Sequence, residues 1–170
     1  MAIFYINFIR NLIGAIPLIL LYYLCLTSID TQTVFFKNFS LNLKYILIFY
    51  WTLRNPSTIG YGHMFFAGIL NDVVIGLPMG TSSICFLILA SIGAYIRQMT
   101  VRVSLLSDWI VFIPSVFTTN FIFFILLSYY SDIEIYYNEL FYNSIVTIIF
   151  YPIFWIFFSF LFNYMRGKIA

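Results

Sequence analysis

Long hydrophobic runs, separated by short polar or charged breaks, follow one another along the chain. A helix that spans a membrane needs about 20 mostly apolar residues. Five of the runs meet this length or come close to it. We therefore predict an all-α fold with spanning helices at residues 12–29, 58–76, 82–96, 109–130 and 140–164.

A sixth span, at residues 41–54, is harder to define. The strongly apolar part, Tyr45 to Leu53, is only nine residues long, and Asn42 and Lys44 precede it. The pattern fits a short helix behind an interfacial segment, or a longer tilted helix whose lysine side chains extend to the interface. It also fits a helix that does not cross the membrane.

Composition restricts the class of protein further. The 170 residues are 63% hydrophobic and 8% charged, whereas soluble domains carry about 25% charged residues. This excludes a soluble globular domain and a disordered chain. The net charge of +2 provides no field that would attract nucleic acid. We expect one integral membrane domain over residues 1–170, in contact with membrane lipid.

Basic residues favour the cytoplasmic side of a membrane, but here they leave the number of crossings open. With six crossings, most basic residues share the side of both termini. With five, Arg10 alone opposes the other seven. Both arrangements place Arg54, Arg97 and Arg102 in the cytoplasm, and the acidic loop at residues 132–139 on the far side.

The most informative segment covers residues 61–83. Gly68, Asp72 and Gly76 recur every four residues and are expected to share one helix face. Small residues on such a face allow a second helix to approach closely. If the face is used within the chain, it packs this helix against another helix of the same chain. Used externally, it would dock a partner.

Asp72 is the only acid that these predicted spans contain. A carboxylate at the centre of a spanning helix costs about 2.5–3.5 kcal/mol, and the dipole at a helix C-terminus disfavours it. Three interpretations follow. Asp72 caps the tight turn that Pro78 and Gly80 predict, or contacts a partner helix or bound polar group, or relays protons or ions.

The sequence contains no recognisable catalytic or metal-binding set. Cys25, Cys85 and His63 lack the spacing of a metal site, and no acid pair or phosphate-binding loop occurs. Ser82 and Ser83 have no neighbouring base that would activate a nucleophile. We therefore expect neither an enzyme nor a cofactor.

Residues 41–95 resemble the MreD family, small integral membrane proteins of the bacterial rod-shape machinery. The resemblance rests on Leu41-Asn42, on YILIFYWTLRNP at 45–56, on GHMFFAGILND at 62–72, and on the turn at 76–80. The family pattern has a proline before the asparagine, where this chain has Leu41. FYPIFW, around Pro152, is also similar to the family.

The resemblance implies six transmembrane helices with both termini in the cytoplasm. It also implies a fold similar to the substrate-binding subunits of energy-coupling-factor vitamin transporters. The implied role is non-catalytic: binding to MreC in the bacterial cytoplasmic (inner) membrane, in an assembly with MreB, the glycosyltransferase RodA and a penicillin-binding transpeptidase. That assembly directs lateral peptidoglycan synthesis and cell shape.

Seven residues are our candidates for structural or partner-contact roles. They are Asn42, Arg54, Gly68, Asp72, Gly76, Pro78 and Gly80.

The alternative function is a substrate-binding subunit of a vitamin transporter, which would share the implied fold. Such a subunit needs a polar pocket near the outer face, and Asn71 and Asp72 would be its beginning. The sequence shows no further polar residues that clearly converge there. It also lacks a small-residue docking motif in the first helix, where Gly14 and Ala15 are adjacent and therefore lie on different faces.

Overall fold

The described part of the chain is entirely helical. The computed structural model describes residues 15–27, 42–56, 58–99, 104–130 and 137–169, and these contain no strand. The helices are α2 (Ile16–Leu26), α3 (Leu43–Arg54), α4 (Tyr61–Ile75), α5 (Thr81–Met99), α6 (Leu105–Tyr130) and α7 (Tyr137–Ile169).

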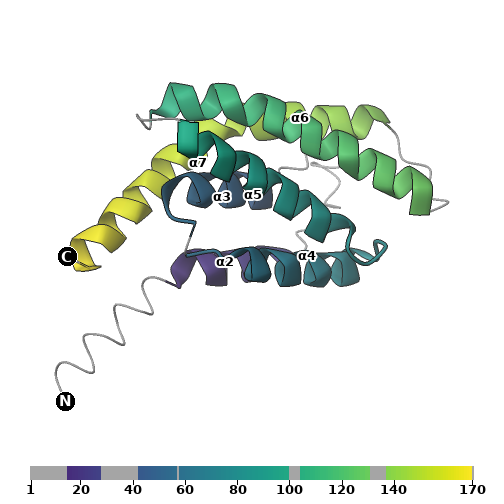
Figure 1. Cartoon of the computed structure of the whole chain (residues 1–170), viewed down its shortest axis with the longest axis horizontal. Helices are drawn as coiled ribbons and strands as arrows, with labels where there is room; N and C mark the ends of the chain where they lie inside the picture. The colour runs from purple at the N-terminus through teal and green to yellow at the C-terminus, as the bar shows by residue number, and fades with distance from the viewer. Residues whose placement is uncertain (1–14, 28–41, 57, 100–103, 131–136, 170) are drawn as a thin grey trace, which may run out of the picture.

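The helices form a layered bundle (Figure 1). On one side α2 packs beside α4, and on the opposite side α6 packs beside α7. Between them lie α3 and α5, which contact each other; α5 also contacts α4 and α6, and α3 also contacts α2 and α7. The bundle is therefore built around its two middle helices.

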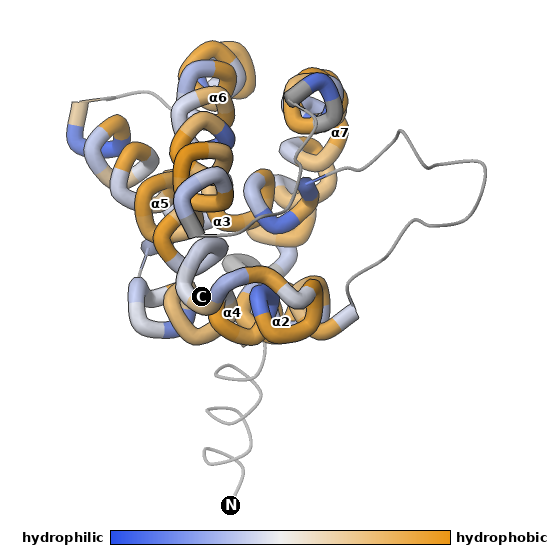
Figure 2. The backbone as a smooth tube through the Cα atoms, turned by 90° about the vertical axis from the view of Figure 1, so that its right-hand side faces the viewer, coloured by the Kyte–Doolittle hydropathy of each residue, from blue (hydrophilic) through white to orange (hydrophobic). Residues whose placement is uncertain are grey.

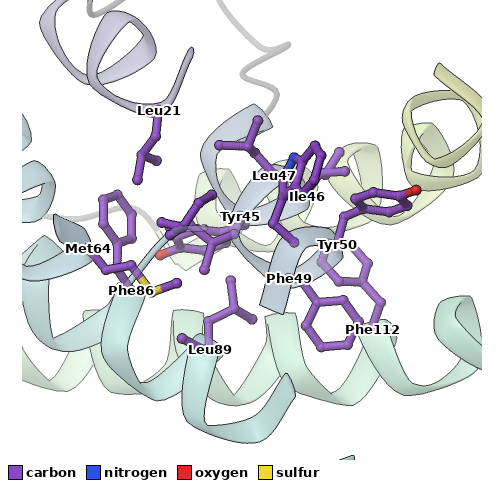
Figure 3. Close-up of a cluster of buried hydrophobic side chains, with 14 of the residues drawn as sticks. Leu21, Tyr45, Ile46, Leu47, Phe49, Tyr50, Met64, Phe86, Leu89 and Phe112 are labelled. Carbon is purple, nitrogen blue, oxygen red and sulfur yellow. The ribbon is translucent and has the colours of Figure 1, made fainter. Parts of the chain in front are cut away.

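α3 is enclosed on all sides. Every residue from Tyr45 to Leu53 is buried, as expected for a helix that is hydrophobic all round. Its aromatic side chains pack into the core shown in Figure 3. The ring centroids of Phe49 and Phe112 are 5.1 Å apart, and Phe112 stacks on Tyr151 with centroids 4.2 Å apart.

Three helices are long and apolar enough to span a membrane. The spanning segments are Thr81–Met99, Leu105–Tyr129 and Leu140–Tyr164, of 19, 25 and 25 residues. Hydrophobic residues also continue along the outer helices of the bundle (Figure 2). By length and composition, the chain is therefore a membrane protein with at least three candidate spans.

The other three helices are shorter than a spanning helix. α2, α3 and α4 contain 11, 12 and 15 residues, which corresponds to about 17–23 Å at 1.5 Å per residue. The hydrocarbon core is about 30 Å thick. Parts of the predicted spans 12–29 and 41–54 also lie outside the described residues. Six crossings therefore stay a prediction.

The first turn of α6 corrects one expectation. α6 begins at Leu105, whereas the predicted span begins at residue 109, so Asp108 lies inside the helix. The candidate span Leu105–Tyr129 therefore contains an acid, Asp108, that the predicted span 109–130 left out. The hydrophobic pattern placed Asp108 in the preceding loop because, in sequence, a charged residue at the start of a helix cannot be distinguished from a loop residue.

Candidate functional site

Asp72 joins the end of α4 to the start of α5. Its side chain is fully buried. Its Oδ2 accepts a hydrogen bond from the Gly80 N–H at 2.8 Å, and its Oδ1 accepts one from the Ser82 N–H at 3.0 Å. The first N–H groups of a helix lack partners within the helix and carry its positive dipole end. Asp72 therefore caps α5 with its negative charge.

The turn between the two helices depends on two glycines. Gly76 has φ +78° and Gly80 has φ +98°, which are left-handed conformations that favour glycine. The N–H groups of Gly76 and Leu77 both donate to the Asp72 carbonyl at 2.9 Å. The Pro78 carbonyl accepts a hydrogen bond from the Thr81 hydroxyl at 2.8 Å.

Gly76 differs from the sequence expectation. It is the residue that ends α4, and a Cβ built on it would have no other atom within 4 Å. Gly76 therefore terminates the helix and does not extend a small-residue packing face. Its role follows from its backbone conformation.

Gly68 packs within the chain. A Cβ at this position would lie 2.4 Å from the Ser83 Cα of α5, which is closer than real Cβ contacts. The Ser83 hydroxyl donates a hydrogen bond to the Phe65 carbonyl at 2.9 Å. Gly68 thus lets α4 and α5 approach backbone to backbone.

A cavity of about 400 Å³, lined by both polar and apolar side chains, lies beside this hairpin. The turn from α4 into α5 is on the right-hand side of Figure 1. Residues from α3, α4, α5, α6 and α7 line it together with the residue before α3. The polar lining consists of Asn42, Lys44, Asn71, Ser82, Asn120 and Asn143.

Lys44 is held at the cavity wall by a chain of hydrogen bonds. Its ammonium donates to Asn71 Oδ1, and Asn71 Nδ2 donates to Ser82 Oγ at 2.8 Å. Lysine side chains near helix ends often extend to the membrane surface. Here the hydrogen bond to Asn71 holds the partly buried Lys44 side chain at the cavity.

Three further asparagines line the cavity. Asn120 Nδ2 donates to Ser144 Oγ at 2.6 Å. Asn143 Oδ1 is buried and has no hydrogen-bond partner among the described residues. Asn42 lies at the start of α3, where its backbone N–H donates to Thr147 Oγ1 of α7 at 3.1 Å. Asn143 therefore brings a buried acceptor without a described partner to the cavity lining.

Arg54 lies at the other end of α3 and does not contribute to the cavity. Its guanidinium is 3.5 Å from Asp108 Oδ2, and Trp155 Nε1 donates to the same oxygen at 2.9 Å. The guanidinium carbon also lies over the rings of Tyr50 and Trp155, 5.4 and 5.2 Å from their centroids. This cluster joins α3, α6 and α7.

Five of the seven candidate residues thus lie in one hairpin, Asn42 lies across the cavity, and Arg54 is remote. Sequence reasoning did not select Lys44, Asn143 or Asp108 as candidates. The available signal was that each is a polar or ionisable residue within or beside an apolar run, which by default marks a functional position in a membrane protein.

Within the described residues, no group of three or more His, Cys, Asp or Glu side chains is arranged to hold a metal ion. Comparison with family models, with curated proteins and with solved structures finds no match. The architecture defines a helical membrane protein with a capped α4–α5 hairpin and a polar cavity beside it.

Proposed function

We propose that the chain is a non-catalytic membrane component of the bacterial cell-elongation complex. In this role it binds MreC and, through it, associates with MreB, RodA and a penicillin-binding transpeptidase. It lies in the cytoplasmic (inner) membrane with six crossings and both termini in the cytoplasm. It supports lateral peptidoglycan synthesis and cell shape.

The observation that carries this proposal is the resemblance over residues 41–95, together with the unit that these residues build. Gly68 brings α4 against α5, and Asp72 caps α5 through Gly80 and Ser82. The residues of the resemblance from position 62 onward thus lie in one hairpin, and those at 42–54 lie at the start of α3 and within it. The outer face of the hairpin carries exposed apolar side chains, including Phe66, through which a protein of membrane helices can contact a partner.

Replacement of Asp72 by leucine tests the proposal. Leucine cannot accept hydrogen bonds from Gly80 and Ser82, so the start of α5 loses its cap. In a strain depleted of its own copy, Asp72→Leu is expected to restore rod shape poorly and to capture less MreC. Val73→Leu is the matched control, because Val73 is 56% exposed beside it.

The level of each variant in the membrane is measured in the same cells. Where Asp72→Leu is made poorly, Asp72→Asn replaces it, since an amide oxygen retains one acceptor. Normal level and full rod shape with Asp72→Leu would contradict a role for the hairpin in the complex.

The polar cavity favours a second candidate function, the substrate-binding subunit of an energy-coupling-factor vitamin transporter. Sequence reasoning lacked polar residues converging near Asn71, and Lys44, Asn120 and Asn143 supply them. A cavity of about 400 Å³ is within the range of small-molecule sites. The test is vitamin uptake into cells that produce the chain, compared with cells that lack it.

A further inference from the structure

The cavity beside the α4–α5 hairpin has a positively charged wall. Lys44 is the only Lys, Arg, Asp or Glu among the described residues that line it. The ammonium has three donors, and the described contacts use one, to Asn71. No described carboxylate lies within ion-pair distance of Lys44.

The nearby acid Asp72 attracts the Lys44 charge but forms no ion pair with it. Its carboxylate accepts hydrogen bonds from the backbone N–H groups of Gly80 and Ser82, and it is not part of the cavity lining. The start of α5 thus already compensates the negative charge of Asp72. Lys44 is partly buried and has no ion-pair partner among the described residues. Partial burial of a cation is costly in a membrane protein, and a bound anion would reduce that cost.

The rest of the lining combines amides with apolar side chains. Asn143 presents a buried oxygen without a described partner, so it can accept a hydrogen bond from a hydroxyl or N–H group. Phe86, Phe123, Leu127 and Leu140 provide apolar surface in the same cavity. A ligand that fits this wall has one polar, charged end and an apolar body.

We propose that this cavity binds an amphipathic molecule with one anionic group, a carboxylate or a phosphate, that pairs with Lys44. The apolar part of the molecule packs against Phe86 and its neighbours, and Asn143 accepts a hydrogen bond from the polar end. The inference concerns the cavity itself and holds for a scaffold protein as well as for a transporter subunit.

The test uses the full chain in nanodiscs of phosphatidylcholine, which has no net charge, with radiolabelled decanoate as the probe. We expect saturable binding that decanoate itself competes and that decylamine, a cation of the same chain length, does not. Lys44→Gln is expected to weaken binding about tenfold or more, the effect of losing one charge-assisted hydrogen bond. Arg97→Gln is the matched control, because it removes a positive charge at an exposed position at the end of α5.

Gel filtration and thermal unfolding show whether Lys44→Gln folds. If it does not fold, a second variant tests the proposal in its place. Asn143→Asp is nearly isosteric and places a carboxylate on the cavity wall, so it is also expected to abolish decanoate binding. Lys44→Arg, which retains the charge, is expected to bind within a few-fold of the wild-type affinity.

Phosphatidylglycerol, added to the nanodiscs, distinguishes the two sources of the anionic group. Competition with decanoate identifies a membrane lipid as the source, and absence of competition identifies a water-soluble organic anion. The proposal is overturned if the wild-type protein binds neither probe saturably. It is also overturned if decylamine competes as well as decanoate, or if Lys44→Gln and Asn143→Asp bind like the wild type.

Discussion

Asp72 shows how a single carboxylate can be accommodated in an apolar chain. Burial of a carboxylate at the centre of a spanning helix costs about 2.5–3.5 kcal/mol, which is an upper value for Asp72 near the end of α4. Hydrogen bonds to a charged group contribute about 1.5–3 kcal/mol each, and Asp72 accepts them from Gly80 and Ser82. The gain and the cost are of similar size. The net effect is to fix how α5 starts relative to α4.

Gly68 provides the most direct prediction at the residue scale. Gly68→Ala places a Cβ 2.4 Å from the Ser83 Cα, so the two helix backbones must separate. Overpacking of this kind costs about 1–3 kcal/mol. We expect Gly68→Ala to lower the free energy of unfolding by this amount, measured by denaturant titration in detergent.

Gly62 is the matched control for this substitution. It lies in the same helix, and a Cβ on it would have no other atom within 4 Å. Gly62→Ala is expected to be neutral or to stabilise by up to about 1 kcal/mol, because alanine favours helix over glycine. Equal stability of the Gly68→Ala and Gly62→Ala proteins would argue against the close approach of α4 and α5.

At the scale of elements, α3 organises the bundle. It is buried along its length, and its last residue, Arg54, pairs with Asp108 at the start of α6. Trp155 of α7 donates to the same carboxylate. One polar cluster therefore connects three helices at the end of the bundle opposite the cavity.

Replacement of Asp108 tests this connection. Asp108→Asn keeps an oxygen for the Trp155 N–H but removes the charge that pairs with Arg54. We expect a loss of about 1.5–3 kcal/mol of unfolding free energy, the value of a hydrogen bond to a charged group. Trp155→Phe keeps a ring beside Arg54 but loses the N–H that donates to the Asp108 carboxylate, so it is expected to cost a similar amount, about 1.5–3 kcal/mol. If Asp108→Asn unfolds like the wild type in the same titration, the cluster does not stabilise the bundle.

Local spacing predicts some of these elements, but it does not predict the cavity. Pro78 and Gly80 follow Asp72 within eight residues, so the sequence alone predicts a tight turn that a nearby carboxylate could cap. The wall of the cavity brings together Lys44, Asn71, Asn120 and Asn143 from four helices. Their convergence depends on the packing of α3 between its neighbours, which no local pattern encodes.

At the scale of the whole molecule, labelling of introduced cysteines measures the number of membrane crossings. Met79 and Met99 are 79% and 68% exposed, near opposite ends of α5. In a background in which Cys25 and Cys85 are replaced by alanine, we expect a membrane-impermeant maleimide to label Met79→Cys in intact spheroplasts. Met99→Cys should be labelled only after permeabilisation.

A cysteine introduced at position 2 determines the number of crossings. Six crossings predict that Ala2→Cys is labelled only after permeabilisation, like Met99→Cys. Labelling of Ala2→Cys in intact spheroplasts would instead indicate five crossings, and would contradict the topology implied by the resemblance.

The central proposal is that the chain acts by binding MreC in the membrane. Affinity purification of the tagged protein in mild detergent, followed by mass spectrometry of the proteins retained, tests it most directly. The account predicts recovery of an MreC-like protein, with or without the RodA and transpeptidase pair. Recovery of two ATPase subunits and a coupling membrane protein, without an MreC-like protein, would contradict it and identify the chain as a transporter subunit.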